Sequence, residues 1–274
     1  MIPQDRDGVR ARELRVSVPL VDTHAHLCDP CFDGDRAEVL ARARQAGVSD
    51  VIAVGESLDD ARRNLGLARE HPGVHAAAGL YPTHLDMAEA EAMIEWIRRH
   101  AGELVAIGEV GLDRWVVKDD AARELQCGIF ERFVALSNEL DLPLNVHSRS
   151  AGRRAVALLV ESAARRVHLH AFDGRPAAAL PGVEAGFFFS VPPSIVRSRQ
   201  KQKLVSRLPL DCLMLETDSP VLGPDRERRN EPASVLVALA AIAEIKRLPV
   251  EAVAEAVTAN TRRLYALPPV PRPG

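Results

Sequence analysis

Two histidines separated by one residue follow an apolar run near the start of the sequence. The stretch VDTHAHLCDP places His24 and His26 directly after Pro19-Leu20-Val21, a run that is typical of a buried strand. Side chains two apart on a strand point to the same side, so the two imidazoles share one face. Two imidazoles at the end of a strand can bind a single cation. For an isolated pair, two hydrogen-bonded structural histidines are the favoured interpretation, so the metal interpretation needs further ligands elsewhere.

Further side chains of the ligand type follow other apolar runs, each where a predicted strand ends. They are Glu109 in AIGEVGLD, His147 in LNVHSR, His170 in HLHAFDG and Asp218 in LETDSP. With the first pair they supply four histidines and two carboxylates from five strands. Such groups at one end of a barrel would be electrostatically unfavourable without cations between them. The set therefore predicts two divalent metal ions per chain.

The predicted ligands divide between the two ions. Our assignment gives one ion His24, His26 and Asp218, gives the other His147 and His170, and places Glu109 as a bridge between them. Imidazole combined with carboxylate favours Zn²⁺ and leaves Mn²⁺ or Mg²⁺ open. Such ions would lower the pKa of a bound water to about 7 and polarise the bond under attack. Asp218 is the predicted proton acceptor, and with Glu109 it forms the predicted catalytic pair.

The elements that must position these residues alternate between strand and helix. Eight strand-like segments are predicted at 19–25, 48–54, 74–79, 104–109, 142–147, 166–170, 183–190 and 211–217. Helical patterns are predicted at 35–46, 57–70, 87–101, 120–140, 151–164, 175–180, 194–207, 231–246 and 250–265. Eight short apolar strands, each followed by a helix, predict an α/β fold, the (β/α)₈ TIM barrel. In that fold the chemistry takes place at the carboxyl ends of the strands.

Length and composition limit the class of protein. The chain has 274 residues, of which 47% are hydrophobic and 27% charged, which fits a globular protein with an ample core. Because we find no linker or repeat, residues 1–274 are predicted to form one barrel domain, with loose ends at about 1–15 and 268–274. The net charge of −3 argues against a general polyanion binder. An aromatic fraction of 4% does not indicate a stacking surface for single strands.

The sequence also carries expectations about location and cysteine chemistry. Its first residues lack the apolar segment of a signal peptide, and no run of roughly 18 or more apolar residues could span a membrane. We therefore expect a cytoplasmic monomer without a membrane partner. Four cysteines in a chain of this length do not indicate a disulfide framework. Cys28 and Cys31 form a lone C-x-x-C pair and are expected to be bystanders beside the site.

Taken together, the blocks that carry these residues resemble the signatures of the TatD family of metal-dependent deoxyribonucleases. They are VDTHAHL, AIGEVGLD, NVHSRSAGR, LHAFDGRP, FFFSVPPSIVRSRQKQKLV and ETDSPVLGP…RNEP, spread over roughly residues 20–265. The HSRSAGR and HAFDGRP forms are most similar to the third human TatD-domain type. The resemblance implies an amidohydrolase-superfamily barrel that cleaves DNA, as an exonuclease acting from single-stranded or frayed 3′ ends. It also implies metal-ligand roles for the same six residues.

One block departs from the family pattern. Family members carry a histidine after the third strand in a Gly-x-His-Pro block, whereas this chain reads GLYPTH, with Tyr81 at that place. Tyr81 can donate a hydrogen bond to a phosphate oxygen, and His84 lies close enough in sequence to substitute. Arg149 and Arg175 complete the predicted substrate contacts, because a guanidinium offers paired donors to phosphate.

Other residues leave alternatives open. Arg226, Arg228 and Arg229 fit phosphate contacts and a solvated charged loop equally well. The run RSRQKQK from Arg197 is interpreted as a solvated helix face away from the strand ends. His168 forms a second H-x-H pair with the next predicted ligand and is interpreted as a core histidine with a hydrogen-bond partner.

The predicted function is a metal-dependent phosphodiester hydrolase, specifically a 3′–5′ exodeoxyribonuclease that uses a metal-activated water. An amidase, lactonase or small phosphoesterase of the same superfamily would keep the metal site and change the bond, and the fold cannot choose among them. A lysine at the fourth strand end would have favoured that branch, but the position holds Glu109. A nonenzymatic nucleic-acid-binding barrel is a third function. Its ligand residues would be expected to be lost, whereas all six are present.

Overall fold

Eight parallel strands form a barrel in the computed structural model, which describes residues 14–267. The strands are β1 Leu20–Ala25, β2 Val48–Ala53, β3 Val74–Ala78, β4 Leu104–Gly111, β5 Leu144–His147, β6 Val167–Leu169, β7 Phe188–Val191 and β8 Leu213–Leu215. They pair in sequential order, and a parallel bridge between Ala25 and Ser219 joins the first edge of the sheet to the last. The predicted (β/α)₈ barrel is therefore confirmed.

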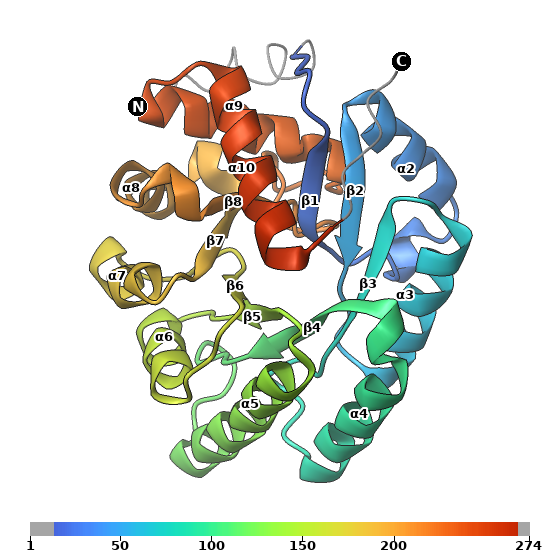
Figure 1. Ribbon diagram of the computed structural model, residues 1–274, viewed down its shortest axis with the longest axis vertical. Coiled ribbons are helices and arrows are strands. Elements are labelled where there is room, and N and C mark those ends of the chain that lie inside the picture. The colour runs from blue at the N-terminus through green and yellow to red at the C-terminus, as the bar shows by residue number, and fades with distance from the viewer. Residues whose placement is uncertain (1–13, 268–274) are drawn as a thin grey trace.

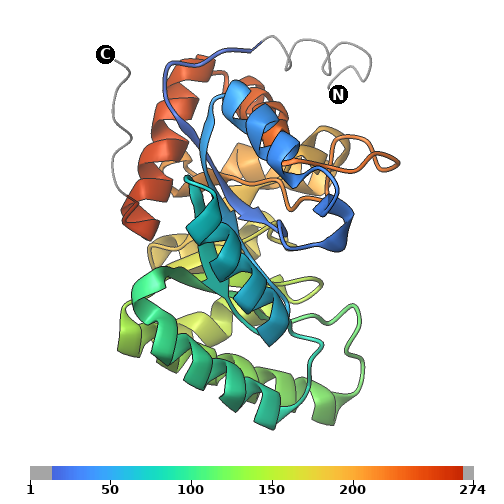
Figure 2. The same ribbon diagram turned by 90° about the vertical axis from the view of Figure 1, so that its right-hand side faces the viewer.

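Helices surround this sheet on its outer side (Figures 1 and 2). They are α2 Arg36–Gln45, α3 Leu58–Glu70, α4 Met87–His100, α5 Asp120–Leu140, α6 Gly152–Glu161, α7 Pro176–Glu184, α8 Arg199–Arg207, α9 Val235–Lys246 and α10 Val250–Tyr265. The connections contain short 3₁₀ helices: η1 Pro30–Phe32, η2 Ala101–Glu103, η3 Pro193–Arg197, η4 Leu210–Cys212 and η5 Pro232–Ser234. Over residues 14–267, we find no helix with the length and apolar character to cross a membrane.

Several helix termini follow local sequence signals. Ser57 and Asp119 each cap a helix by accepting a hydrogen bond from a backbone N–H of its first turn. Gly47 follows α2 with a φ of 88°, a left-handed conformation that favours glycine. Ser194 was a predicted helix start, and this prediction is wrong. It lies in η3, and the following helix is capped by Ser198 instead.

The boundaries of the seventh unit also differ from the prediction. The helix predicted at 175–180 continues through Pro181 to Glu184, so the strand predicted at 183–190 begins only at Phe188. A proline inside a helix removes its own N–H from the ladder and crowds the carbonyl four residues before it, but it leaves its own carbonyl free to accept. Its carbonyl still accepts from the N–H of Ala185 at 3.0 Å, so the helix continues past it.

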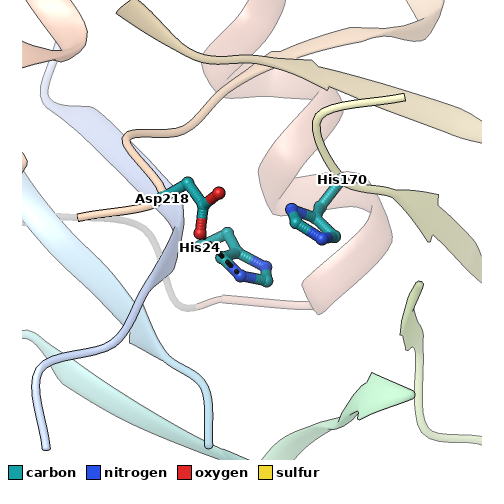
Figure 3. A group of neighbouring side chains, drawn as sticks. All are labelled: His24, His170 and Asp218. Atoms are coloured by element: carbon teal, nitrogen blue, oxygen red, sulfur yellow. Dashed lines mark ion pairs between the residues drawn. The ribbon is translucent and has the colours of Figure 1, made fainter. Parts of the chain in front are cut away.

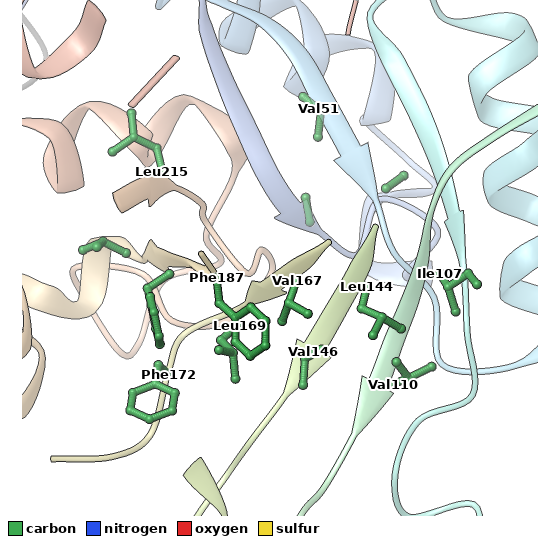
Figure 4. Packing of buried hydrophobic residues seen from close by; sticks show 14 of the residues in the cluster. Val51, Ile107, Val110, Leu144, Val146, Val167, Leu169, Phe172, Phe187 and Leu215 are labelled. Atoms are coloured by element: carbon green, nitrogen blue, oxygen red, sulfur yellow. The ribbon is translucent and has the colours of Figure 1, made fainter. Parts of the chain in front are cut away.

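The hydrophobic core lies in two places. The larger cluster packs the strands against the helices, and Figure 4 shows part of it around Ile107, Leu144 and Val167. The smaller cluster joins side chains from the strands to the end of α10, where Tyr265 is buried. Arg166, which precedes β6, donates to the carbonyl of Leu264. The end of α10 therefore lies at the amino ends of the strands, which leaves the carboxyl ends for a site.

The predicted loose ends lie almost wholly outside the described residues, which exclude 1–13 and 268–274. Leu14, at the start of the described region, is partly buried against the larger core cluster. The assignment of the whole chain to one domain stays a prediction.

Candidate metal centre

The side chains predicted to bind metal meet at the carboxyl end of the barrel. Three overlapping groups each bring ligand atoms within 4.8 Å of one another. The groups are His24, His26 and Glu109; His24, His170 and Asp218; and Glu109, His147 and His170. Figure 3 shows the second group, in which Asp218 and His170 lie beside His24. Since each group shares a member with the next, the six residues form one continuous cluster.

The ends of five strands position this cluster. Its members are His24 in β1, His26 just beyond β1, Glu109 in β4, His147 at the end of β5, His170 just after β6 and Asp218 in the turn after β8. Asp218 has a φ of 55°, and its backbone N–H donates to the His24 carbonyl at 2.8 Å. The backbone contact that closes the barrel thus also holds Asp218 beside the first histidine pair.

Glu109 is the central anion of the cluster. Its Oε1 lies 2.6 Å from His147 Nδ1 and 2.9 Å from His170 Nε2. Its Oε2 lies 3.6 and 3.5 Å from the Nε2 atoms of His24 and His26. Burial raises the pKa of Glu109, but the charges of His170 and His147 outweigh it and hold that pKa well below its ordinary value. An ionised carboxylate that reaches four imidazoles is placed to bridge two cations.

The first histidine pair shares a second carboxylate. Asp218 Oδ1 lies 3.4 Å from the Nε2 atoms of both His24 and His26. Burial lowers the pKa of His26, but the hydrogen bond that its ring donates to Asp218 and the charge of Glu109 outweigh it and raise that pKa to about 9. Burial and the neighbouring His170 hold the pKa of His24 well below its ordinary value. His24 therefore presents a neutral imidazole, while on His26 a proton competes with a cation for the same nitrogen.

Asn145 fixes the orientation of His24. Its Nδ2 donates to the carbonyl of Thr23 at 3.0 Å, so its Oδ1 faces the other way and accepts from His24 Nδ1 at 2.8 Å. With the proton on Nδ1, the lone pair of His24 is on Nε2, the atom that faces Glu109 and Asp218. The tautomer needed for metal binding is thus set before any ion is present.

Asp113 supports His147 in the same way, with its Oδ2 3.1 Å from His147 Nε2. Replacing Asp113 with alanine is expected to weaken metal affinity by about 10- to 100-fold, because the His147 ring loses the carboxylate that orients it. Competition with a chelating indicator measures this change. Asp119→Ala is the matched control, since Asp119 caps α5 in the same loop without an interaction with His147. Equal affinity losses in both variants would contradict the orienting role.

A chain of buried polar side chains leads from Tyr265 to His170. Tyr265 OH lies 2.6 Å from His168 Nδ1, and His168 Nε2 lies 2.5 Å from Ser190 Oγ. Ser190 donates to Glu216 at 2.6 Å, and Glu216 lies 3.6 Å from His170 Nδ1. The interpretation of His168 as a hydrogen-bonded core histidine is confirmed. Glu216, which the sequence analysis did not single out, contacts the ring nitrogen of His170 that faces away from Glu109.

Tyr81 and His84 occupy different places at the mouth of the barrel. The Tyr81 hydroxyl lies 3.5 Å from His147 Nε2, so this side chain reaches the cluster. His84 is 38% exposed and pairs with Glu89 of α4 at 3.1 Å, which places it on the rim. The structure therefore brings Tyr81, rather than His84, to the predicted metal ligands.

The predicted phosphate contacts Arg149 and Arg175 are both exposed at the rim. Arg149 lies over the ring of Trp115, with its guanidinium carbon 5.3 Å from the ring centroid. Arg229 is instead paired with Asp35 at 2.6 Å. Of the three arginines in the loop after β8, Arg229 therefore forms an ion pair within the protein, which favours a structural role over a phosphate contact.

The interpretation of RSRQKQK as a solvated face is wrong for Lys201. This side chain is partly buried, and its Nζ donates to the carbonyl of Ala171 at 3.0 Å, in the turn just after His170. Burial lowers the pKa of Lys201, against the opposing charges of Glu216, Asp173 and Asp218. The helix begins later than predicted, and its first turn lies against the loop after β6 instead of away from it.

Cys28 and Cys31 do not join the cluster. Among residues 14–267, the groups able to hold a metal ion contain only histidine and carboxylate side chains. Burial raises the pKa of the Cys28 thiol to about 12, and burial with the neighbouring Asp29 raises that of Cys31 to about 11. Both thiols therefore stay protonated at neutral pH, which agrees with their interpretation as bystanders.

Comparisons with known proteins cover almost the whole described chain. The sequence matches the family described as TatD related DNase over residues 21–266. It is 43% identical to the human protein named Deoxyribonuclease TATDN3, over 90% of this chain and 95% of that protein. It is 33% identical to the Uncharacterized metal-dependent hydrolase YabD of Bacillus subtilis (strain 168), over 90% and 99% of the two chains. The crystal structure of YjjV, a TatD homolog from Escherichia coli K12, superposes with a TM-score of 0.85 at 30% identity, covering 92% of this chain and 100% of that chain.

Proposed function

Since the chain belongs to the family of TatD-related DNases, we propose that it is a 3′–5′ exodeoxyribonuclease with two divalent metal ions per chain. As a member of this family it is a metal-dependent hydrolase acting on ester bonds. The observation that carries the proposal is the position of Glu109 between two histidine pairs. The name of the human relative supports DNA as the substrate, and the 3′ direction rests on the resemblance of the signature blocks alone.

The donor set fits divalent cations. His24, His26 and Asp218 would hold one ion, and His147 and His170 the other, with Glu109 between them. This division agrees with two of the three observed groups, while the third brings His170 close to His24 and Asp218. The buried carboxylates supply the negative charge that divalent ions require, and the imidazoles favour Zn²⁺ over Mg²⁺.

Asp218 and Glu109 take different roles because their environments differ. When bound, such cations lower the pKa of a coordinated water to about 7 and polarise the phosphodiester. The Asp218 side chain is 10% exposed and the Glu109 side chain 2%. Asp218 therefore lies nearer the substrate, where it accepts the proton of the attacking water and returns it to the leaving oxygen. Glu109, whose pKa is held well below its ordinary value, stays ionised as the bridge.

Tyr81 is the proposed phosphate donor closest to the cluster. Burial and the charge of Glu109 raise the pKa of Tyr81, so its hydroxyl keeps its proton and can donate to a phosphate oxygen. The exposed guanidinium groups of Arg149 and Arg175 lie farther out on the rim and would contact phosphates of the following nucleotides. His84 would lie at the edge of the same face.

End-labelled oligonucleotides test this function. The full chain, loaded in turn with Mg²⁺, Mn²⁺, Zn²⁺ and Co²⁺, should shorten a 5′-labelled single strand one nucleotide at a time. A 3′-labelled strand should lose its label in the first step. A chelator should stop both reactions. Absence of cleavage with every metal, or faster turnover of amides and lactones than of phosphodiesters, would reject the proposal.

A further inference from the structure

An exposed tryptophan stands on the catalytic rim. Trp115 lies in the loop between β4 and α5, on the same side of the barrel as Glu109, and is 58% exposed. The other tryptophan, Trp96, is 8% exposed and stacks on His100 of its own helix. A large indole open to solvent on this side of the barrel is available to contact a bound ligand.

The backbone beneath this indole is held in place. Asp113 Oδ1 accepts hydrogen bonds from the backbone N–H groups of Trp115 and Val116, each at 2.8 Å. The other oxygen of Asp113 contacts His147 Nε2 at 3.1 Å. One carboxylate thus links the loop that carries the indole to a predicted metal ligand. The backbone that carries the indole is therefore tied to the site through this carboxylate.

Two cationic side chains lie over the indole. The Arg149 guanidinium carbon and the Lys118 Nζ each lie 5.3 Å from the centroid of a Trp115 ring. A backbone hydrogen bond of 2.9 Å from the N–H of Arg114 to the carbonyl of Arg149 joins the two loops. An exposed indole with two cations over its rings suits a ligand that has both flat rings and negative charge. Single-stranded nucleic acid combines these two features, whereas an apolar protein partner would bury the cations without compensation.

We propose that Trp115 and Arg149 form a nucleobase subsite, in which the indole stacks on one base of a single DNA strand and the guanidinium contacts the adjacent phosphate. This proposal rests on the proposed nuclease function and adds a determinant for single strands. In a duplex the bases are already stacked on one another, so the indole favours unpaired ends. The stack would hold the strand at a fixed distance from His147, because Asp113 ties the two together.

Strand binding with and without bases tests the subsite. The full chain carrying Asp218→Asn is titrated with a fluorescent single strand and with the same strand made of abasic units. Trp115→Leu is expected to weaken binding of the natural strand by about 5- to 150-fold, the effect of one lost base stack. It should leave binding of the abasic strand unchanged. Trp115→Phe should recover most of the loss, because a phenyl ring also stacks.

Two further variants sharpen the result. Val116→Ala is the matched control, since Val116 is 55% exposed in the same loop and has no stacking role. Arg149→Gln should reduce the slope of log Kd against log salt concentration by about 0.7, as expected for one lost phosphate contact on a single strand. The subsite would be overturned if Trp115→Leu bound the natural and the abasic strand as tightly as the Asp218→Asn parent does. An equal loss of affinity for the two strands, or no strand binding by that parent, would overturn it as well.

The outcomes separate this inference from the nuclease function. Cleavage of 3′ ends by the unsubstituted chain, together with unchanged base dependence of strand binding in the Trp115→Leu variant, would remove only the subsite. Base-dependent binding through Trp115 without cleavage under any metal would instead remove only the nuclease function.

Discussion

Replacing Asp218 with asparagine is expected to lower kcat on a single-stranded oligonucleotide by about 10²- to 10⁴-fold at saturating metal. Asparagine keeps the shape of the side chain and an oxygen that can face His24 and His26. It cannot accept a proton, so the attacking water loses its base and the leaving oxygen loses its acid. Single-turnover cleavage with excess enzyme measures the chemical step separately from product release.

Asp225→Asn is the matched control for this variant. Asp225 is an exposed carboxylate in the loop after β8, where it accepts a hydrogen bond from the backbone of Glu227. Its loss removes the same charge from the same loop without touching the cluster. If Asp218→Asn retained the turnover of the Asp225→Asn control, the base would have to be another residue.

Replacing Glu109 with glutamine is expected to weaken metal binding by about 10³-fold. Two unit charges 4 Å apart interact by about 4 kcal/mol at an effective dielectric constant of 20, which corresponds to about 10³-fold in affinity. Glu109 is 1% exposed and reaches all four histidines, so solvent cannot replace its charge. Competition with a fluorescent chelator measures the affinity, and circular dichroism shows whether the fold is kept.

Glu103→Gln provides the comparison for Glu109. Glu103 pairs with Arg69 at the surface, where its side chain is 44% exposed, so its substitution should leave metal affinity unchanged. Metal affinity equal to that of the parent in the Glu109→Gln variant would show that Glu109 does not bridge the ions.

The convergence of the six predicted ligands could be predicted because a parallel barrel brings all its strand ends to one rim. Each ligand type stood where an apolar run ended, so barrel topology alone placed residues as distant as His24 and Asp218 together. Sequence could not supply the distances. Those depend on the backbone that joins β1 to β8, including the hydrogen bond from Asp218 N to the His24 carbonyl.

The residues that support the cluster also share a sequence pattern. Two positions before a predicted ligand, the chain carries a polar residue in or just after a strand: Asn145 before His147, His168 before His170 and Glu216 before Asp218. Residues two apart share a face, so these side chains lie one step deeper in the barrel. The interpretation of His168 used this rule, and applying it to every strand would have found Asn145 and Glu216 as well.

Other features could not be predicted from composition or helical pattern. An aromatic fraction of 4% averages over the chain and cannot separate the buried Trp96 from the exposed Trp115. Lys201 was assigned to a solvated face because the helix predicted at 194–207 was expected to lie away from the strand ends. The helix begins only at Arg199, after the 3₁₀ helix η3, and the Lys201 side chain lies against the turn after β6.

A crystal structure of the metal-loaded chain, with anomalous data collected on both sides of the absorption edge of the metal, tests the central claim most directly. Two anomalous peaks should lie within the cluster, one on each side of the Glu109 carboxylate. The first should contact His24, His26 and Asp218, and the second His147 and His170. A fully loaded crystal without peaks among these side chains, or with its peaks elsewhere on the molecule, would contradict the account.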